Sequence, residues 1–347
     1  MSKFMTSAVN STFLQACMGQ VPVHRPVWLM RQAGRILPPY RQLRAQTGSI
    51  LKLFKTPDLA AQVTLMPINM LEVDAAILFA DILTPIEPMG CQIDFVPGPV
   101  FAKPVRSRAD IDALRTIDPQ AQLPYVLETI RLVRQALPPH IPLIGFAGAP
   151  FTLATYMVEG DGAKEFTHFR RLLHADRGAA DALLDKLTEV TITYLKAQIA
   201  AGVQAVQLFD TWIGALSAPL FEQLALPHLQ RIFLALEGSG VPRIYYANGA
   251  AHFLDLLPKT GADVLSLDWR SDLGETFQRF GRHLPLQGNM DPCALFADPP
   301  AIIAEAERIL TQTQGLPHIF NLGHGVHPDT PCDHVKLLVD TIHGFAP

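Results

Sequence analysis

The chain has 347 residues, of which 49% are hydrophobic and 17% are charged, and its formal net charge is −4. This composition is too apolar for a disordered chain and is sufficient for a large buried core. The negative net charge argues against general binding to nucleic acid or to an anionic membrane surface, so any polyanionic ligand must be bound at a local site.

Signals for export or membrane insertion are missing from the sequence. Residues 1–20 contain no apolar run long enough for a secretory signal, and no stretch approaches the roughly eighteen apolar residues of a membrane-spanning helix. We therefore expect a cytoplasmic protein that does not associate with membranes. The four cysteines (Cys17, Cys91, Cys293 and Cys332) are scattered, without metal-ligand spacing. They are expected to be free thiols that act as small hydrophobic residues in a reducing compartment.

Short apolar runs recur along the whole chain and show little polar alternation, which is typical of strands buried on both faces. In chain order the runs are Pro26–Met30, Ala75–Ala80, Pro142–Phe146, Ala205–Phe209, Arg243–Tyr246, Val264–Leu267, Pro285–Gln287 and His318–Leu322.

Longer segments with apolar residues at every third or fourth position separate several of these runs and predict helices. The clearest are Pro57–Leu71, Ala179–Ala201, Pro219–Glu237 and Ala301–Gln314. Asp58 in a first turn and Gly202 just past a last turn fit the signals for helix start and stop. Strands that alternate with helices predict an α/β fold with a parallel sheet.

A polar or glycine-bearing motif follows almost every apolar run. Examples are Arg31-Gln-Ala-Gly-Arg35, Asp81, Asp210-Thr-Trp212 and Gly323-His-Gly325. Chemistry at the carboxyl end of nearly every strand is the arrangement of a (β/α)8 TIM barrel, whereas an open doubly wound sheet would concentrate it at one switch point. We therefore predict one (β/α)8-barrel domain over residues 1–347.

The segment from Arg25 to Pro57 is strongly basic. It holds seven cations and no aspartate or glutamate: Arg25, Arg31, Arg35, Arg41, Arg44, Lys52 and Lys55. A solvated basic face is one interpretation. The other is a site for a ligand with several carboxylates or phosphates, because Arg31 and Arg35 follow directly on a buried strand and guanidinium groups match carboxylates bidentately.

Four further strand runs are followed by candidate site residues. Asp81 emerges from an apolar run, and it either caps the following turn or accepts hydrogen bonds from ligand N–H groups. Tyr156, taken alone, is more typical of a core tyrosine with a satisfied hydroxyl group than of a site residue. His324 lies between two glycines and could be an ordinary turn histidine, and Thr211 offers a hydroxyl group after the fourth run.

Seven strings in this order resemble the uroporphyrinogen decarboxylase family from about residue 10 to the C-terminus. They are Pro26-Val-Trp-Leu-Met-Arg-Gln-Ala-Gly-Arg35, Phe79-Ala-Asp-Ile-Leu83, Gly145-Phe-Ala-Gly-Ala-Pro-Phe-Thr-Leu153, Tyr156-Met-Val-Glu-Gly160, Gln207-Leu-Phe-Asp-Thr-Trp212, Gln287-Gly-Asn-Met-Asp-Pro292 and Asn321-Leu-Gly-His-Gly325. The arginine-rich string and Asn-Leu-Gly-His-Gly are the most specific of these.

The resemblance implies a (β/α)8 barrel, a homodimer, and a cofactor-independent carboxy-lyase that binds no metal. It implies conversion of the tetrapyrrole uroporphyrinogen III to coproporphyrinogen III in haem and chlorophyll biosynthesis. Position by position, it implies that the substrate is bound by Arg31, Gln32, Ala33, Gly34, Arg35, Asp81, Tyr156, Thr211 and His324. Among these, Asp81, Arg31 and Tyr156 are expected to be catalytic.

Two positions depart from the family pattern. The family usually has an aromatic residue at position 36 and a glutamate at position 39, where this chain has Ile36 and Pro39. How the first loop, which carries Arg31 and Arg35, is supported is therefore open, whereas both arginines match the family pattern.

The chemistry that the resemblance implies needs an electron sink for the loss of carbon dioxide. A protonated pyrrole ring of the substrate supplies that sink, so no organic cofactor is required. Asp81 would stabilise the cationic ring, while the proton donor remains open among Arg31, Tyr156 and a water held by Asp81.

Two other functions compete with this interpretation. One is a zinc- and corrinoid-dependent methyltransferase, which would need a His-x-Cys pair that the sequence lacks. The other is a tetrapyrrole carrier without activity, which would be expected to lose Asp81 or the first-loop arginines.

Overall fold

The structure is a computed structural model that describes residues 11–95, 98–162, 165–281 and 283–345. Its centre is a seven-stranded sheet in the order β1-β4-β5-β6-β7-β8-β9, and every neighbouring pair is parallel. The strands are β1 (Ala76–Ile77), β4 (Leu143–Gly148), β5 (Ala205–Asp210), β6 (Arg243–Ala247), β7 (Val264–Leu267), β8 (Leu286–Met290) and β9 (His318–Leu322). Nearly all their residues are buried, as the apolar runs predicted.

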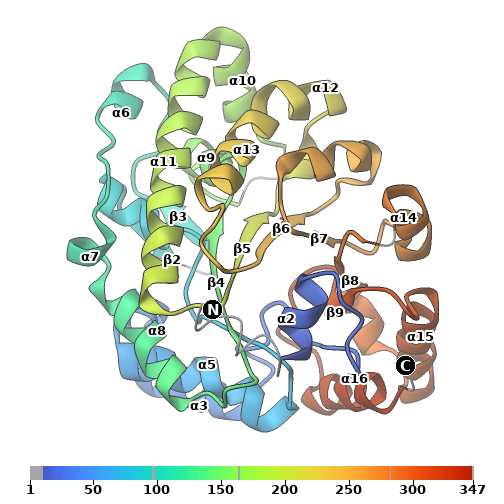
Figure 1. Ribbon diagram of the computed structural model, residues 1–347. Coiled ribbons are helices and arrows are strands. Elements are labelled where there is room, and N and C mark those ends of the chain that lie inside the picture. The colour runs from blue at the N-terminus through green and yellow to red at the C-terminus, as the bar shows by residue number, and fades with distance from the viewer. Residues whose placement is uncertain (1–10, 96–97, 163–164, 282, 346–347) are drawn as a thin grey trace.

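Helices pack around the outside of this curled sheet (Figure 1). The longer ones are α3 (Pro38–Thr47), α5 (Pro57–Leu71), α8 (Pro124–Ala136), α9 (Pro150–Glu159), α10 (Thr167–Ala175), α11 (Arg177–Ala201), α13 (Leu226–Ala235), α14 (Leu273–Phe280), α15 (Pro299–Gln312) and α16 (Cys332–Gly344). The short ones are α2 (Thr12–Cys17), α4 (Ile50–Lys55), α6 (Arg108–Asp112), α7 (Pro119–Gln122) and α12 (Ala218–Leu220).

The sequence signals for helix ends are confirmed. Helix α5 begins at Pro57 and has Asp58 in its first turn. Helix α11 is capped at its start by the Asp176 side chain, which accepts from the Ala179 N–H at 2.9 Å. It ends at Gly202, whose φ of 119° lies in the left-handed region that favours glycine.

One predicted helix is interrupted. The segment Pro219–Glu237 folds as the end of α12, a π-helical turn at Phe221–Ala225, and then α13. The reason is Pro227, which has no N–H for the carbonyl of Gln223. The Arg177 guanidinium donates to that carbonyl instead, at 3.3 Å.

The predicted strand Pro26–Met30 forms a single parallel bridge, between Val27 and Phe320 of β9. The N–H groups that would extend it are taken by side chains: Leu29 donates to Gln32 Oε1 at 2.9 Å and Met30 donates to Asn321 Oδ1 at 3.0 Å. On the other side, the Asp74 N–H, two residues before β1, donates to the Val27 carbonyl at 2.8 Å.

The segment around Val27 therefore bonds to β9 on one side and to the start of the β1 region on the other. Helix α2, which precedes this segment, also lies beside β9 (Figure 1). The segment thus lies between β9 and the residues just before β1.

A chain of buried side chains crosses the interior of the sheet. Trp28 Nε1 donates to Gln287 Oε1 at 2.9 Å, and Gln287 Nε2 donates to Gln207 at 3.0 Å and to Ser266 at 2.9 Å. These partners come from β5, β7 and β8, so the bonds fix the first segment against the later strands.

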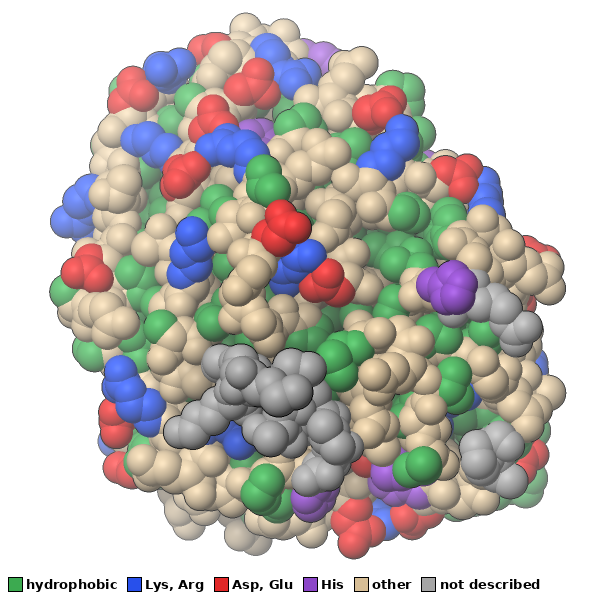
Figure 2. Space-filling view, in the orientation of Figure 1, with side chains coloured by type: hydrophobic (Ala, Val, Ile, Leu, Met, Phe, Trp, Pro, Cys, Tyr) green, Lys and Arg blue, Asp and Glu red, His purple; other side chains and the backbone are tan. Residues whose placement is uncertain are grey.

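An antiparallel hairpin, β2 (Ile93–Phe95) with β3 (Pro99–Phe101), was not predicted. Among the described residues, no helix is both long enough and apolar enough to cross a bilayer. On the face shown in Figure 2, lysine and arginine side chains alternate with aspartate and glutamate side chains.

Candidate functional site

A cavity of about 490 Å³ opens among the segments that follow the strands. Its lining comes from the first loop, the stretch after β1, the β2–β3 hairpin, β4 and β5, helix α9 and the turn after β9. Eight of the nine predicted site residues line it: Arg31, Ala33, Gly34, Arg35, Asp81, Tyr156, Thr211 and His324. Segments far apart in the chain meet here because the carboxyl ends of parallel strands share one edge of the sheet.

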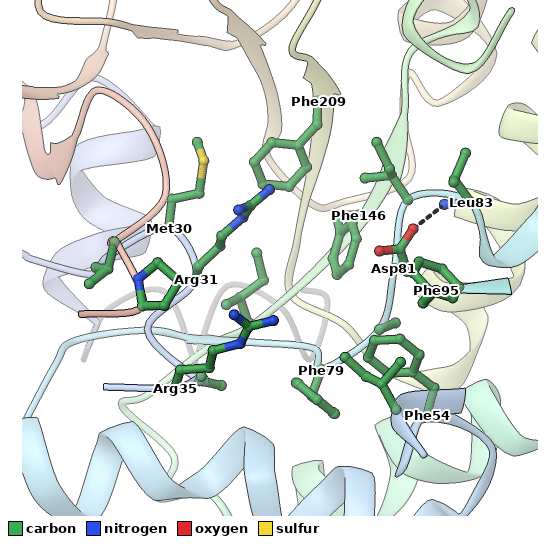
Figure 3. A pocket seen from close by; sticks show the side chains of 18 of the residues that line it. Met30, Arg31, Arg35, Phe54, Phe79, Asp81, Leu83, Phe95, Phe146 and Phe209 are labelled. Carbon is green, nitrogen blue, oxygen red and sulfur yellow. Dashed lines mark hydrogen bonds between the residues drawn. The ribbon is translucent and has the colours of Figure 1, made fainter. Parts of the chain in front are cut away.

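Arg31 and Arg35 enter the cavity from one side, and Asp81 lies on the opposite side (Figure 3). Within the described residues, neither guanidinium forms an ion pair or a hydrogen bond with the protein. Unpaired arginines in an apolar cavity are ready to bind carboxylates bidentately.

The position of the Arg31 side chain depends on the left-handed backbone of Arg31 and on the lack of a side chain at Gly325. Its φ is 64°, a left-handed value that is uncommon for a residue with a side chain. The stem of the side chain then passes directly over Gly325. A Cβ atom added at Gly325 would lie 2.7 Å from Arg31 Cγ and 2.9 Å from Arg31 Nε. The sequence around Gly325 does not indicate this contact, because the contact joins two distant parts of the chain.

Gln32 is the predicted site residue that does not line the cavity. It is fully buried, and its side chain accepts from the Leu29 N–H at 2.9 Å and donates to the Ala75 carbonyl at 3.0 Å. Its contacts hold the base of the first loop against the β1 region.

Arg41 supports the other end of this loop. Its guanidinium donates to the carbonyls of Arg35 at 2.8 Å and of Ile36 at 3.1 Å. Ile36 is buried, and Pro39 lies in the first turn of α3, where a missing N–H has no cost. These contacts show how the loop is supported with Ile36 and Pro39 in place.

The cationic residues of the basic segment from Arg25 to Pro57 therefore have different roles. Arg25 is half-buried and donates to the carbonyls of Leu316, Thr313 and His318 at 2.8–3.2 Å. Burial lowers the pKa of Arg25 to about 10. Arg44 lies with Arg35 and Arg41 in a neighbouring surface basin rather than in the cavity.

Asp81 caps a turn and also faces the cavity. Its Oδ1 accepts from the Leu83 N–H at 2.8 Å, and its own N–H donates to Thr84 Oγ1 at 3.3 Å. Among the described residues, no group donates to Oδ2. Desolvation raises the pKa of this carboxyl group, while the Leu83 N–H and the charge of Arg31 act in the opposite direction. One oxygen is thus structural and the other is free to accept from a ligand.

Phenylalanines form much of the cavity wall between the arginines and Asp81: Phe54, Phe79, Phe95, Phe146 and Phe209. Phe146 and Phe209 pack edge to face with centroids 5.5 Å apart. Met30 and Phe209, which end the apolar runs Pro26–Met30 and Ala205–Phe209, both line the cavity. The other four phenylalanines carry no local signal that separates them from core residues.

His324 is held in a neutral form. Its Nδ1 accepts from the Gly325 N–H at 2.7 Å, so the proton of the neutral ring is on Nε2. Burial and then the charge of Arg31 lower the pKa of His324 to about 4. At neutral pH this ring can donate one hydrogen bond to an anionic ligand and adds no charge.

Tyr156 and Thr211 are linked through Trp212. The Tyr156 ring packs against Trp212 with centroids 5.8 Å apart, and burial and the charge of Asp81 raise the pKa of its hydroxyl group. The Trp212 N–H donates to Thr152 Oγ1 at 3.1 Å. Thr152 in turn donates to Asp210 at 2.6 Å, so the turn that carries Thr211 rests on a buried carboxyl group.

No cluster of three or more histidine, cysteine, aspartate or glutamate side chains in the described part of the chain is arranged to hold a metal ion.

Comparisons with known proteins cover nearly the whole chain. The sequence model of the uroporphyrinogen decarboxylase (URO-D) family matches residues 8–345. Curated uroporphyrinogen decarboxylases from Trichlorobacter lovleyi and Geobacter sulfurreducens are each 48% identical over 336 residues, which is 96% of this chain and 98% of theirs. A solved methyltransferase from Methanosarcina mazei has a TM-score of 0.82 at 22% identity and covers 96% of this chain and 98% of that chain. At that identity the last match shows similarity of fold alone.

Proposed function

This chain belongs to the uroporphyrinogen decarboxylase family, and on that basis we propose that it converts uroporphyrinogen III to coproporphyrinogen III in haem and chlorophyll biosynthesis. The reaction removes the carboxylates of four acetate side chains as carbon dioxide and leaves four methyl groups. The observation that carries the proposal is the cavity itself, in which two unpaired guanidiniums face one carboxylate across an apolar space. An apolar macrocycle with pyrrole N–H groups and a carboxylate rim is complementary to that arrangement.

The roles of the site residues follow from where their charges lie. Arg31 and Arg35 bind acetate and propionate carboxylates. Asp81 accepts from pyrrole N–H groups through its free oxygen and stabilises the ring when it becomes cationic. Burial raises the pKa of Asp81 and so disfavours its ionised form. A cationic pyrrole ring beside the carboxylate is stabilised by its negative charge and in turn favours ionisation of Asp81.

Tyr156, Thr211 and His324 orient the ring that reacts. Neutral His324 can donate from Nε2 to a substrate carboxylate without adding charge. Gln32 acts indirectly, because its side chain supports the loop that carries the arginines. Asp81, Arg31 and Tyr156 are the residues to which we assign the chemistry, without an organic cofactor or a metal.

We further propose that the sheet closes into an eight-stranded barrel and that residues 1–347 form one domain. The bonds of the Val27 segment to Phe320 on one side and to Asp74 on the other support this closure. A homodimer and a cytoplasmic location are proposals that rest on the family. Light scattering of the purified protein tests the first of these.

The test of function is anaerobic incubation with uroporphyrinogen III, followed by chromatography of the oxidised products and measurement of carbon dioxide. The expected result is stepwise appearance of hepta-, hexa-, penta- and tetracarboxylate porphyrins. Binding of the substrate without release of carbon dioxide would instead identify a carrier.

A further inference from the structure

A second and smaller cavity lies behind Asp81, on the side away from the arginines. Its volume is about 20 Å³. It shares Phe54, Asp81, Leu83 and Phe95 with the main cavity, so these side chains form a thin wall between the two spaces. Asp81 thus faces the substrate space on one side and the small cavity on the other.

The small cavity has the size and the polarity for one water molecule. A water needs at least about 10–15 Å³ and two to four polar partners. Polar residues that can form hydrogen bonds line it together with apolar neighbours: Lys55, Asp81, Thr84, Glu87 and Tyr125. A third hydroxyl group lies nearby, because Tyr194 is hydrogen-bonded to the side chain of Thr84.

The outer end of the cavity reaches solvent at an ion pair. Lys55 Nζ lies 2.7 Å from Glu87, and the two side chains are 39% and 45% exposed. Tyr125, at the start of α8, lines the cavity together with this pair and Asp81. Burial and the charge of Glu87 raise the pKa of Tyr125 to about 12. Its hydroxyl group therefore keeps its proton near neutral pH and can donate and accept hydrogen bonds at once.

The proposed reaction needs a supply of protons. In each round the ring is protonated, and the bond between the acetate methylene and its carboxylate breaks. Its electron pair passes to the ring and carbon dioxide leaves. A proton then forms the new C–H bond at the methylene, and the ring returns the proton it took. One proton from water is consumed for each carboxylate that leaves.

A bound macrocycle lies between Asp81 and the mouth of the main cavity, so protons need another way to this carboxylate. We propose that the small cavity holds one water which, with Tyr125 and Glu87, carries protons from solvent to Asp81 while the substrate is bound. This inference rests on the proposed function and adds to it a source for the proton. Glu87 exchanges protons with solvent, and Tyr125 and the water pass them inward.

The test uses Tyr125→Phe, which removes one hydroxyl group, and Glu87→Gln, which removes the exposed acid. Each should lower kcat about tenfold, less than the 10²–10⁴ of a general acid itself, while KM stays within about twofold. The ratio of kcat in H2O to kcat in D2O should rise above that of the unchanged enzyme. The double variant should be no slower than the slower single variant, because both residues act in one route.

Glu128→Gln is the matched control, because Glu128 lies on the same helix α8 as Tyr125 and forms a surface pair with Arg131. Its kcat and isotope ratio should equal those of the unchanged enzyme. Wild-type values in Glu87→Gln and Tyr125→Phe would overturn the route, and so would a raised KM with normal kcat. If Tyr125→Phe fails to fold, Glu87→Gln still decides, because its side chain is exposed. If the unchanged enzyme releases no carbon dioxide, the proposed function fails instead.

Discussion

Replacement of Gly325 by alanine should damage the site through Arg31 alone. The new Cβ would lie 2.7 Å from Arg31 Cγ, whereas ordinary van der Waals contact begins at 3.4 Å. Arg31 Cδ would lie closer still, so the stem must withdraw by about 0.7 Å at Cγ and by more at Cδ, into the cavity that Arg31 lines. The φ of Gly325 is not positive, so the alanine backbone itself is unstrained.

The expected cost follows from this displacement. A shift of about 1 Å in a substrate-positioning group can lower the rate about 10²-fold. We therefore expect kcat/KM to fall by roughly 10²-fold, which corresponds to about 2.7 kcal/mol of transition-state stabilisation. The melting temperature should change little, because the displaced side chain moves into open space rather than into the core.

The assay is kcat/KM for coproporphyrinogen formation together with thermal melting. Gly344→Ala is the control, because a Cβ at that position has no heavy atom within 4 Å. Activity of the Gly325→Ala variant within about threefold of normal would refute the assignment of Arg31 as a positioned anchor. A large loss of stability would refute the view that Arg31 can yield.

Asp81→Asn should lower turnover by about 10²–10³ with little change in melting temperature, and Asp81→Glu should lose less, because its charge remains. An asparagine variant with at least half the normal turnover would indicate that Asp81 only caps a turn and has no electrostatic role in the reaction. The Arg35→Met variant should stay folded and lose about 2–5 kcal/mol of transition-state stabilisation, measured through kcat/KM. A near-normal kcat/KM would indicate that Arg35 belongs to a solvated basic face. Burial raises the pKa of Asp210 to about 7, so its contribution to stability is complete below its unfolded pKa of 3.8 and is lost as the pH rises through 7. Between pH 5 and pH 8 the melting temperature of the Asp210→Asn variant should therefore fall less than that of the unchanged protein. An equal fall in both proteins would contradict the raised pKa of Asp210.

The sequence predicted the order of the seven strands and most of the residues that line the cavity, because both depend on local order, but only β7 and β9 have the predicted bounds. Each buried run is followed by its polar motif, and parallel pairing alone brings Asp81, Thr211 and His324 to one edge of the sheet. The α/β class and the parallel sheet are confirmed, and so are the bounds of α5.

Features that depend on contacts across the chain could not be predicted in this way. Gln32 turns inward because the backbone groups of Leu29 and Ala75 need partners, which nothing in its own motif indicates. Phe54 and Phe95 resemble core residues until the cavity beside them is known. The Val27 segment forms one bridge where a strand was predicted, because side chains satisfy its remaining N–H groups.

The contacts of the first segment also set an order of events during protein synthesis. Trp28 and Met30 emerge early from the ribosome, yet their hydrogen-bond partners Gln287 and Asn321 follow 259 and 291 residues later. At a synthesis rate of about 5–20 residues per second, these partners appear about 15–60 s after the segment does. The loop that carries Arg31 and Arg35 is synthesised early but is consequently among the last parts to be fixed in place. A nascent chain that stops short of β9 cannot hold Arg31 in its binding position.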